Sequence, residues 1–94
     1  MIKHIVMWKF REGEEENMKL FLSRLNGLKE QIEVIKGLET HIGIKKDGSY
    51  DAVLISEFEN EADLNAYKHD ERHVKVSELC KSIREARAVI DYEE

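Results

Sequence analysis

Residues 38–58 read LETHIGIKKDGSYDAVLISEF, and this stretch decides the fold. Apolar and polar residues alternate on both sides of a polar segment at 46–49, which is the pattern of two half-buried strands. The Asp-Gly pair within that segment is typical of a tight reversal between strands. The sequence therefore predicts an antiparallel hairpin with strands over 38–45 and 50–58.

A strand and a long helix precede the hairpin. Residues 2–10 alternate as a strand, and residues 14–34 carry apolar side chains at helical spacing behind glutamates that suit the positive end of a helix dipole. Gly27 costs this helix about 1 kcal/mol relative to alanine, so a bend or a close contact is expected there, and Gly37 is expected to end the helix. The strand face that should pack under helices carries Ile2, His4, Val6, Trp8 and Phe10.

A split helix and a last strand follow the hairpin. Asn60 suits the N-cap of a short helix over 61–68. Polar residues at 68–72 interrupt this helix, and apolar residues at helical spacing then resume as far as Ile83. Residues 84–92 alternate again and are expected to form the fourth strand.

The predicted order is β-α-β-β-α-β, an α+β arrangement of the ferredoxin-like kind with one antiparallel four-stranded sheet and helices on one face only. The other face is left bare. It should carry Ile5, Met7, Val53, Ile55 and Val89, which are apolar enough to need a cover, and a second copy of the chain is the simplest one. The sequence therefore predicts one domain over 1–94 that forms a homodimer through its open sheet face, as in a dimeric α/β barrel.

The composition argues against some classes of partner and indicates a cellular compartment. Twenty acidic residues against fifteen basic ones give a net charge of -5, and no local Lys/Arg cluster is evident, which argues against nucleic acid and against an anionic membrane. The single cysteine, Cys80, cannot form an intramolecular disulfide. The N-terminal residues lack a signal-peptide core or a membrane-spanning run, so a cytoplasmic location is expected.

Three segments carry a resemblance to a known family. They are residues 2–10 (IKHIVMWKF), 67–76 (YKHDERHVKV) and 87–92 (RAVIDY). In their order and spacing they resemble the stress-responsive A/B barrel (Dabb) family of the dimeric α/β barrel superfamily over nearly the whole chain. The resemblance implies a dimer whose two sheets form a central barrel with the helices outside.

The resemblance also implies a set of site residues. In the family, a histidine of the first strand, a tyrosine near the end of the short helix and a histidine six residues later approach one another, and these match His4, Tyr67 and His73. The family often has His-Pro before the last histidine, where this chain has Asp70-Glu71. That departure weakens any transfer of activity.

One plant relative, a polyketide cyclase of the olivetolic acid type, suggests roles for these residues. By similarity, His73 would be the general base, Tyr67 would donate a hydrogen bond to a carbonyl oxygen, and His4 would be a supporting polar group. No cofactor would be required. The competing interpretation is structural, with both histidines satisfied in the core or an interface and Tyr67 packed with its hydroxyl bonded locally.

Other residues give weaker indications. Trp8 is similar to the tryptophan of cofactor-free or haem-degrading monooxygenases, but core packing explains it more simply. Cys80 lies in an apolar stripe and is expected to be a core residue. His69 and His73 are four residues apart, but a helix is expected to begin between them, so neither a metal nor a cofactor is predicted.

The favoured function is that of a homodimeric protein that binds a small molecule between sheet and helices. Two alternatives stay open. One is a cofactor-independent enzyme, polyketide-cyclase-like or monooxygenase-like, with His73 as base beside Tyr67 and His4. The other is a structural scaffold that forms larger assemblies. The pocket is expected to be lined by Val6, Trp8, Phe21, Leu25, Val76 and Cys80.

Overall fold

The computed structural model describes residues 1–44, 47 and 49–94. The strands are β1 (Ile2–Phe10), β2 (Gly37–Ile42), β3 (Ala52–Phe58) and β4 (Arg84–Glu93), and the helices are α1 (Glu15–Gln31), α2 (Glu61–His69) and α3 (Glu71–Ile83). The order β-α-β-β-α-α-β confirms the predicted α+β, ferredoxin-like class with its second helix split in two.

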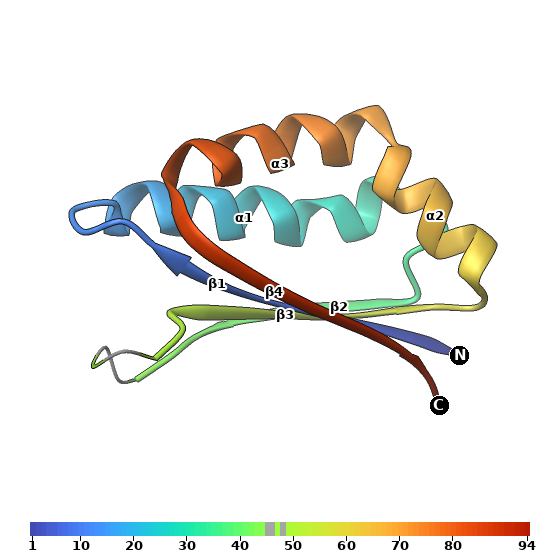
Figure 1. Ribbon diagram of the computed structural model, residues 1–94. Coiled ribbons are helices and arrows are strands. Elements are labelled where there is room, and N and C mark those ends of the chain that lie inside the picture. Colours follow the sequence, from blue (N-terminus) through green and yellow to red (C-terminus); the bar gives the residue numbers. More distant parts are fainter. Residues whose placement is uncertain (45–46, 48) are drawn as a thin grey trace.

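The four strands form one antiparallel sheet in the order β2-β3-β1-β4. Figure 1 shows α1 and α3 side by side over one face of the sheet, with α2 at the end where both termini lie, and the opposite face without helices. The Glu94 amide donates a hydrogen bond of 3.0 Å to the Met1 carbonyl at that end. Within the described residues, no helix is both long and apolar enough to span a membrane.

The core lies between this sheet and α1, as the alternation in β1 predicts. The side chains of Ile2, His4, Val6, Trp8 and Phe10 are all buried on the helix-covered face. They meet an apolar stripe on α1, whose buried members are Met18, Phe21, Leu22, Leu25 and Leu28.

The first helix is shorter than the sequence predicts. It ends at Gln31 because Ile32 adopts an extended conformation, so the predicted end at Val34 is wrong and Gly37 opens β2 instead of ending the helix. Ile32 and Ile35 are nevertheless buried, which is why the apolar spacing continues past the helix. Gly27 lies within a continuous helix on its exposed side, and a methyl group added there would meet only the side-chain amide of Gln31, at 3.8 Å, so the expected close contact is not found.

The hairpin is present, but its strands are shorter than predicted. The second strand stops at Ile42, and the next one begins at Ala52, not at residue 50. Just before β3, the Asp51 carbonyl still accepts from the Gly43 amide across the hairpin at 2.7 Å, whereas the Asp51 amide donates to the Trp8 carbonyl at 2.8 Å and its carboxylate accepts from the Phe10 amide at 2.8 Å. In the predicted strand end and turn, residues 45, 46 and 48 lie outside the described part of the chain.

The break in the second helix is a single residue, not the predicted segment 68–72. Asp70 is extended, and its amide donates to the Tyr67 carbonyl at 3.2 Å while its carboxylate accepts from the Arg72 amide at 2.9 Å. Hydrogen bonds from the Arg72 side chain and amide lower the pKa of Asp70 to about 2, so the cap stays charged. Asn60 caps α2 as predicted, accepting from the Asp63 amide at 2.8 Å.

The bare face differs from the prediction at one position. Ile5 lies opposite Ile55 of β3 and Ile90 of β4, whereas Val89 lies opposite Val6 and therefore faces the helices. The assignment of Val89 to the bare face is thus wrong, because β4 holds an extra residue, Glu85, opposite the Lys9–Phe10 step. A slip of one residue moves every side chain of a strand to the other face.

The bare face is apolar at its centre and open to solvent. Met7 is 39% exposed and Ile90 is 60% exposed. Ion pairs lie at the margins of this face, among them Lys3 with Glu57 at 2.6 Å. A face of this kind is the usual signature of an interaction surface.

Candidate functional site

A cavity of about 300 Å³ lies between the edge strand β4 and the helix α3. It exists because α3 packs mainly along α1 and does not settle onto β4. The wall of the cavity includes all the side chains that the sequence puts forward for a site: His4, Val6, Trp8, Phe21, Leu25, Tyr67, His73, Val76 and Cys80. The structure thus brings these side chains together around one space.

His4 is fixed in the cavity wall by a carboxylate that sequence reasoning missed. Asp91 lies opposite His4 in the β1–β4 ladder, and its Oδ1 accepts a hydrogen bond from His4 Nδ1. Burial lowers the pKa of His4 from its ordinary 6.5, and the bond to Asp91 offsets this only in part. The imidazole is therefore neutral near pH 7, with its Nδ1 proton on the Asp91 side and the Nε2 lone pair free to accept.

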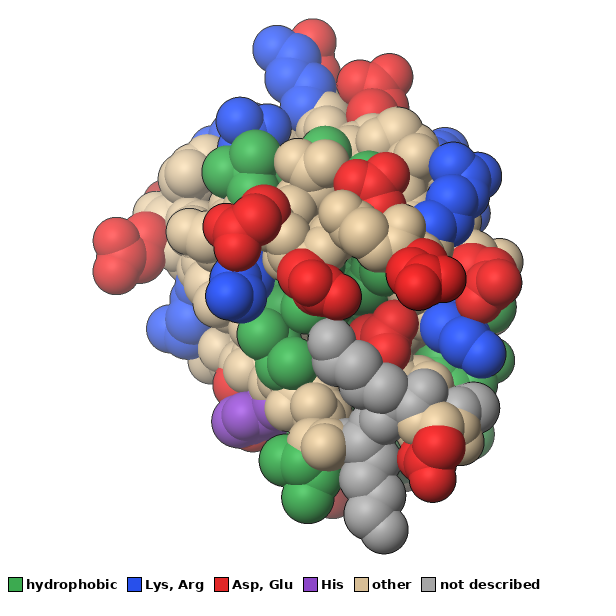
Figure 2. Space-filling model, turned by 90° about the vertical axis from the view of Figure 1, so that its left-hand side faces the viewer, with side chains coloured by type: hydrophobic (Ala, Val, Ile, Leu, Met, Phe, Trp, Pro, Cys, Tyr) green, Lys and Arg blue, Asp and Glu red, His purple; other side chains and the backbone are tan. Residues whose placement is uncertain are grey.

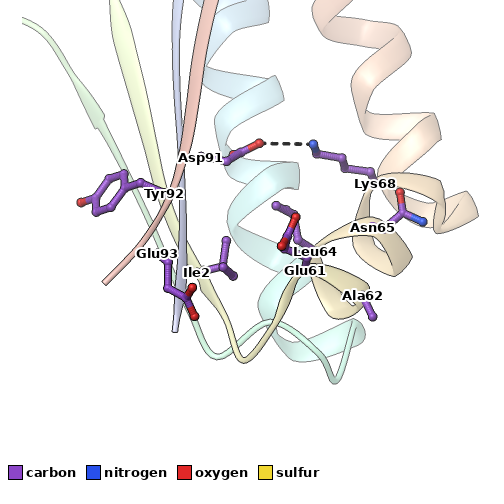
Figure 3. A pocket seen from close by; sticks show the side chains of 9 residues that line it. All are labelled: Ile2, Glu61, Ala62, Leu64, Asn65, Lys68, Asp91, Tyr92 and Glu93. Atoms are coloured by element: carbon purple, nitrogen blue, oxygen red, sulfur yellow. Dashed lines mark hydrogen bonds and ion pairs between the residues drawn. The ribbon is translucent and has the colours of Figure 1, made fainter.

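Asp91 also touches the end of α2. Its second oxygen lies 3.4 Å from Lys68 Nζ, and Figure 3 shows the two side chains pointing at one another from β4 and α2. Burial works to raise the pKa of Asp91, but its interactions with His4 and Lys68 together outweigh burial and lower it. The carboxylate is therefore ionised when it holds His4.

Tyr67 lies in the last turn of α2, in the cavity wall, and is fully buried, at 0% exposure. Its ring lies 4.3 Å from the ring of His73 and 6.2 Å from that of His4, measured between centroids. Among the described residues, its hydroxyl is buried without a hydrogen-bond partner. Burial raises the pKa of the Tyr67 phenol, so the hydroxyl keeps its proton and can donate it in a hydrogen bond.

His73 reaches the same place from the first turn of α3. The chain bends at the extended residue Asp70, and the His73 imidazole lies against the Tyr67 ring with its Nδ1 3.2 Å from the Lys68 carbonyl. Burial lowers the pKa of His73, with His4 and Arg87 adding to the effect. A carbonyl can only accept, so Nδ1 carries the proton and Nε2 is again a free acceptor.

The middle of the cavity is apolar. Trp8 and Phe21 meet edge to face with ring centroids 5.0 Å apart, which fixes the indole as part of the core. Burial raises the pKa of the Cys80 thiol, and this disfavours the thiolate that a nucleophile would need. The remaining apolar wall comes from Val6, Leu25, Leu54 and Val76.

Basic side chains line the rest of the cavity, and sequence reasoning missed these as well. Arg87 lies opposite Trp8 in the ladder, which places it on the helix-covered side. Lys81 and Arg84 precede it at the α3–β4 junction, and Lys68 comes from α2. The signal in the sequence is weak, because three of these basic residues are spread over positions 81–87 and form no continuous basic run.

Two other hollows lack these features. The one in Figure 3, about 620 Å³, lies between α2 and the end of β4, where Lys68 and Asp91 satisfy one another. Another hollow, of about 480 Å³, is lined by both acidic and basic residues. It lies at the end of the molecule seen in Figure 2, where carboxylates and basic side chains are mixed on the surface. Tyr67 lines neither of them, although its hydroxyl is the one buried side-chain polar atom without a hydrogen-bond partner in the described part of the chain. The smaller cavity is therefore the better candidate.

The two histidines of the 67–76 segment do not act as a pair. His69 closes α2 with its Nδ1 2.9 Å from the Asn65 carbonyl, whereas His73 belongs to α3. In the part of the chain that the structure describes, no three His, Cys, Asp or Glu side chains are grouped as they would be to hold a metal ion.

Comparison with known proteins shows which family the chain matches. The sequence profile of the family described as "Stress responsive A/B Barrel Domain" matches residues 2–94. The stress-response A/B barrel domain-containing protein DABB1 of Arabidopsis thaliana is 26% identical over 98 residues, which cover 98% of this chain and 46% of that protein. The chain therefore spans about half the length of this curated relative.

Two solved structures illustrate the fold. A dimeric protein of unknown function with a ferredoxin-like fold, from Bacteroides fragilis, is 28% identical with a TM-score of 0.91, covering 99% of this chain and 95% of that one. An antibiotic biosynthesis monooxygenase is 18% identical with a TM-score of 0.78, covering 100% and 98%. The second likeness concerns the fold alone.

Proposed function

The chain belongs to the stress-responsive A/B barrel domain family, and on that basis we propose that it is a homodimeric protein that binds a small molecule in the cavity between β4 and α3. The observation that carries this proposal is the Tyr67 hydroxyl, which is buried without a partner among the described residues beside that cavity. A buried polar group without a hydrogen bond costs about 1–3 kcal/mol. A ligand that accepts this hydrogen bond would recover that free energy.

The polar groups around Tyr67 define what such a ligand would offer. The hydroxyl donates, while the free Nε2 atoms of His4 and His73 accept, so a carbonyl or hydroxyl oxygen next to a donor would satisfy them. The apolar middle of the cavity would hold a hydrocarbon or aromatic body. The site thus suits a small, mostly apolar molecule with an oxygen function.

The dimer is proposed from the bare sheet face. Ile90, Ile5 and Ile55 form a row across three strands with no helix above it. The Bacteroides fragilis protein, with the same fold, is described as dimeric. A second copy that lays the same face on this row would bury it symmetrically.

Catalysis by the same residues is the second candidate. The observation that favours it is the pair of imidazoles held by Asp91 and the Lys68 carbonyl, each neutral and flanking a phenol that keeps its proton. Such a set could take a proton from carbon beside a carbonyl while the Tyr67 hydroxyl stabilises the enolate oxygen. A rate of proton exchange that depends on His73 would distinguish this enzyme from a binding protein.

Replacing Tyr67 by phenylalanine tests the binding proposal. In the ligand-free protein, Tyr67→Phe is expected to raise the free energy of unfolding by about 1 kcal/mol, because it removes an unsatisfied buried hydroxyl. The same change should weaken binding of acetophenone by about 3–10-fold, the loss expected for one neutral hydrogen bond, and leave binding of ethylbenzene unchanged. Chemical denaturation and calorimetric titration measure the two effects.

Tyr50→Phe is the matched control, because the Tyr50 ring is exposed and does not line the cavity. It should change neither quantity. Lower stability of Tyr67→Phe together with unaltered acetophenone binding would mean that the hydroxyl already has a structural partner, and the proposal would then be wrong.

A further inference from the structure

We infer that the ligand of this cavity carries a carboxylate, bound at the α3–β4 end by Arg87 with Lys81 and Arg84; this inference rests on the binding function proposed above. The opposite end of the same ligand would present its oxygen function to Tyr67. The ligand class is therefore an acid with an apolar body.

The charged side chains that line the cavity are all positive. The cavity is lined by Lys68, Lys81, Arg84 and Arg87, and among the described residues no Asp or Glu side chain lines it. The cavity lining is therefore positively charged, whereas the whole chain has a net charge of -5. An acidic protein that gathers its cations around one apolar cavity raises the local concentration of anions there.

Three of these four cations lack carboxylate partners among the described residues. Lys68 is paired with Asp91, but no ion pair of the described residues uses Lys81, Arg84 or Arg87. The positive charge of Arg87 also affects the two histidines of the cavity. Burial is the larger cause at both His4 and His73, and the charge of Arg87 adds to the lowering of each pKa. An anion beside Arg87 would gain a charge-assisted hydrogen bond without displacing a carboxylate of the protein.

The cations and the polar groups lie at opposite ends of the cavity wall, with apolar side chains between them. In the β1–β4 ladder, Arg87 stands opposite Trp8, and Asp91 stands opposite His4. Four residues of strand separate these two levels, about 13 Å of backbone at roughly 3.3 Å per residue. Apolar side chains, Val6 and Val89 among them, occupy the interval.

This order selects the occupant. A free phosphate or a small dicarboxylate would meet the cations but leave the apolar interval in contact with water. A neutral aromatic would fill the interval and leave three cations without a counter-charge. A monocarboxylate with a hydrocarbon or aromatic body matches both parts, and an oxygen at its far end would also reach the hydroxyl of Tyr67.

Two pairs of matched ligands test the inference by calorimetry on the full chain: cinnamate against cinnamamide, and octanoate against octanamide. Each acid is expected to bind at least about 10-fold more tightly than its amide, which is the strength of one hydrogen bond between charged groups. Arg87→Gln should remove most of that preference, because it weakens binding of the acids much more than binding of the amides. Arg24→Gln, which removes an exposed charge of α1 that does not line the cavity, should have no effect.

The outcomes separate this inference from the function on which it rests. Equal affinity for acid and amide, or an acid preference that survives Arg87→Gln, would overturn the inference and leave small-molecule binding intact. No binding of any of the four compounds at millimolar concentration would overturn both. Inorganic phosphate that competes with cinnamate as strongly as octanoate does would show a general anion site, and the carboxylate assignment would be wrong.

Discussion

The variant Ile90→Lys is expected to dissociate the proposed dimer into monomers. Ile90 is 60% exposed in the single chain and lies opposite Ile5 at the centre of the bare face, so a lysine there costs the monomer little. In a symmetric dimer the same position would be buried twice, once in each copy. Each buried, unpaired charge costs about 3–5 kcal/mol, so the dissociation constant should rise by about 1,000-fold or more.

Light scattering after size-exclusion chromatography measures this change directly. The mass should fall from twice 11.0 kDa to 11.0 kDa, with an unaltered circular dichroism spectrum. Val74→Lys is the matched control, because Val74 is also an exposed apolar residue but lies on α3, on the other side of the sheet. An Ile90→Lys protein that keeps the mass of the wild type would place the dimer contact elsewhere. A mass well above twice 11.0 kDa for the wild type would favour a larger scaffold.

Stability is expected to decrease as the pH falls from about 7 to 5. Burial lowers the pKa of both His4 and His73 in the folded chain below the ordinary 6.5. Below that pH the unfolded chain therefore binds more protons at these histidines than the folded chain does. The free energy of unfolding drops by up to about 2 kcal/mol for each histidine over this range. The lowered pKa of Asp91 acts in the same direction only at lower pH, below its ordinary 3.8.

Denaturation curves at a fixed protein concentration across this range test the effect. The variant His73→Gln should flatten the slope by up to about 1.4 kcal/mol per pH unit, the value for one proton. His69→Gln serves as control and should leave the slope unchanged, because the His69 side chain is exposed on the folded chain. A wild-type stability that is flat from pH 7 to 5 would mean that the folded chain binds as many protons as the unfolded chain, and the expected lowering of the two pKa values would then be wrong.

Much of the fold could be predicted from the sequence because strand alternation leaves only two choices of face. In β1 that rule placed His4, Val6 and Trp8 correctly on the covered side. It failed in β4, where Glu85 is an extra residue and shifts the alternation, since a bulge leaves no mark in the hydrophobic pattern. The end of α1 was missed for a similar reason, because Ile32 is buried outside the helix as well as it would be inside.

The polar residues of the candidate site could be predicted only where a family pattern supplied them, whereas its apolar lining residues followed from the alternation and helical spacing. His4, Tyr67 and His73 came from the resemblance, and the structure adds that the chain bends at a single residue, Asp70, and that the His73 ring lies against the Tyr67 ring. Asp91 could not be found in the same way. In the sequence it is one more polar residue in an alternating strand, and only its register with β1 shows which side chain it holds.

Arg87 was missed on the same grounds as Asp91, since it too is a charged residue in the last strand. Composition was also misleading here, because a net charge of -5 conceals a local group of cations. Charge summed along a chain says nothing about which side chains share a cavity, and that depends on the pairing of β4 with β1 and on the space left under α3.

An NMR titration of the imidazole nitrogens tests the central claim, ligand binding beside His4 and His73, most directly. The chain has four histidines, of which His4 and His73 line the cavity while His41 and His69 are exposed elsewhere. Titration with acetophenone and with cinnamate at constant pH should shift the signals of His4 and His73 to saturation and leave the other two in place. Shifts of all four that never saturate, or no shift with either compound, would contradict the claim that this cavity is a binding site.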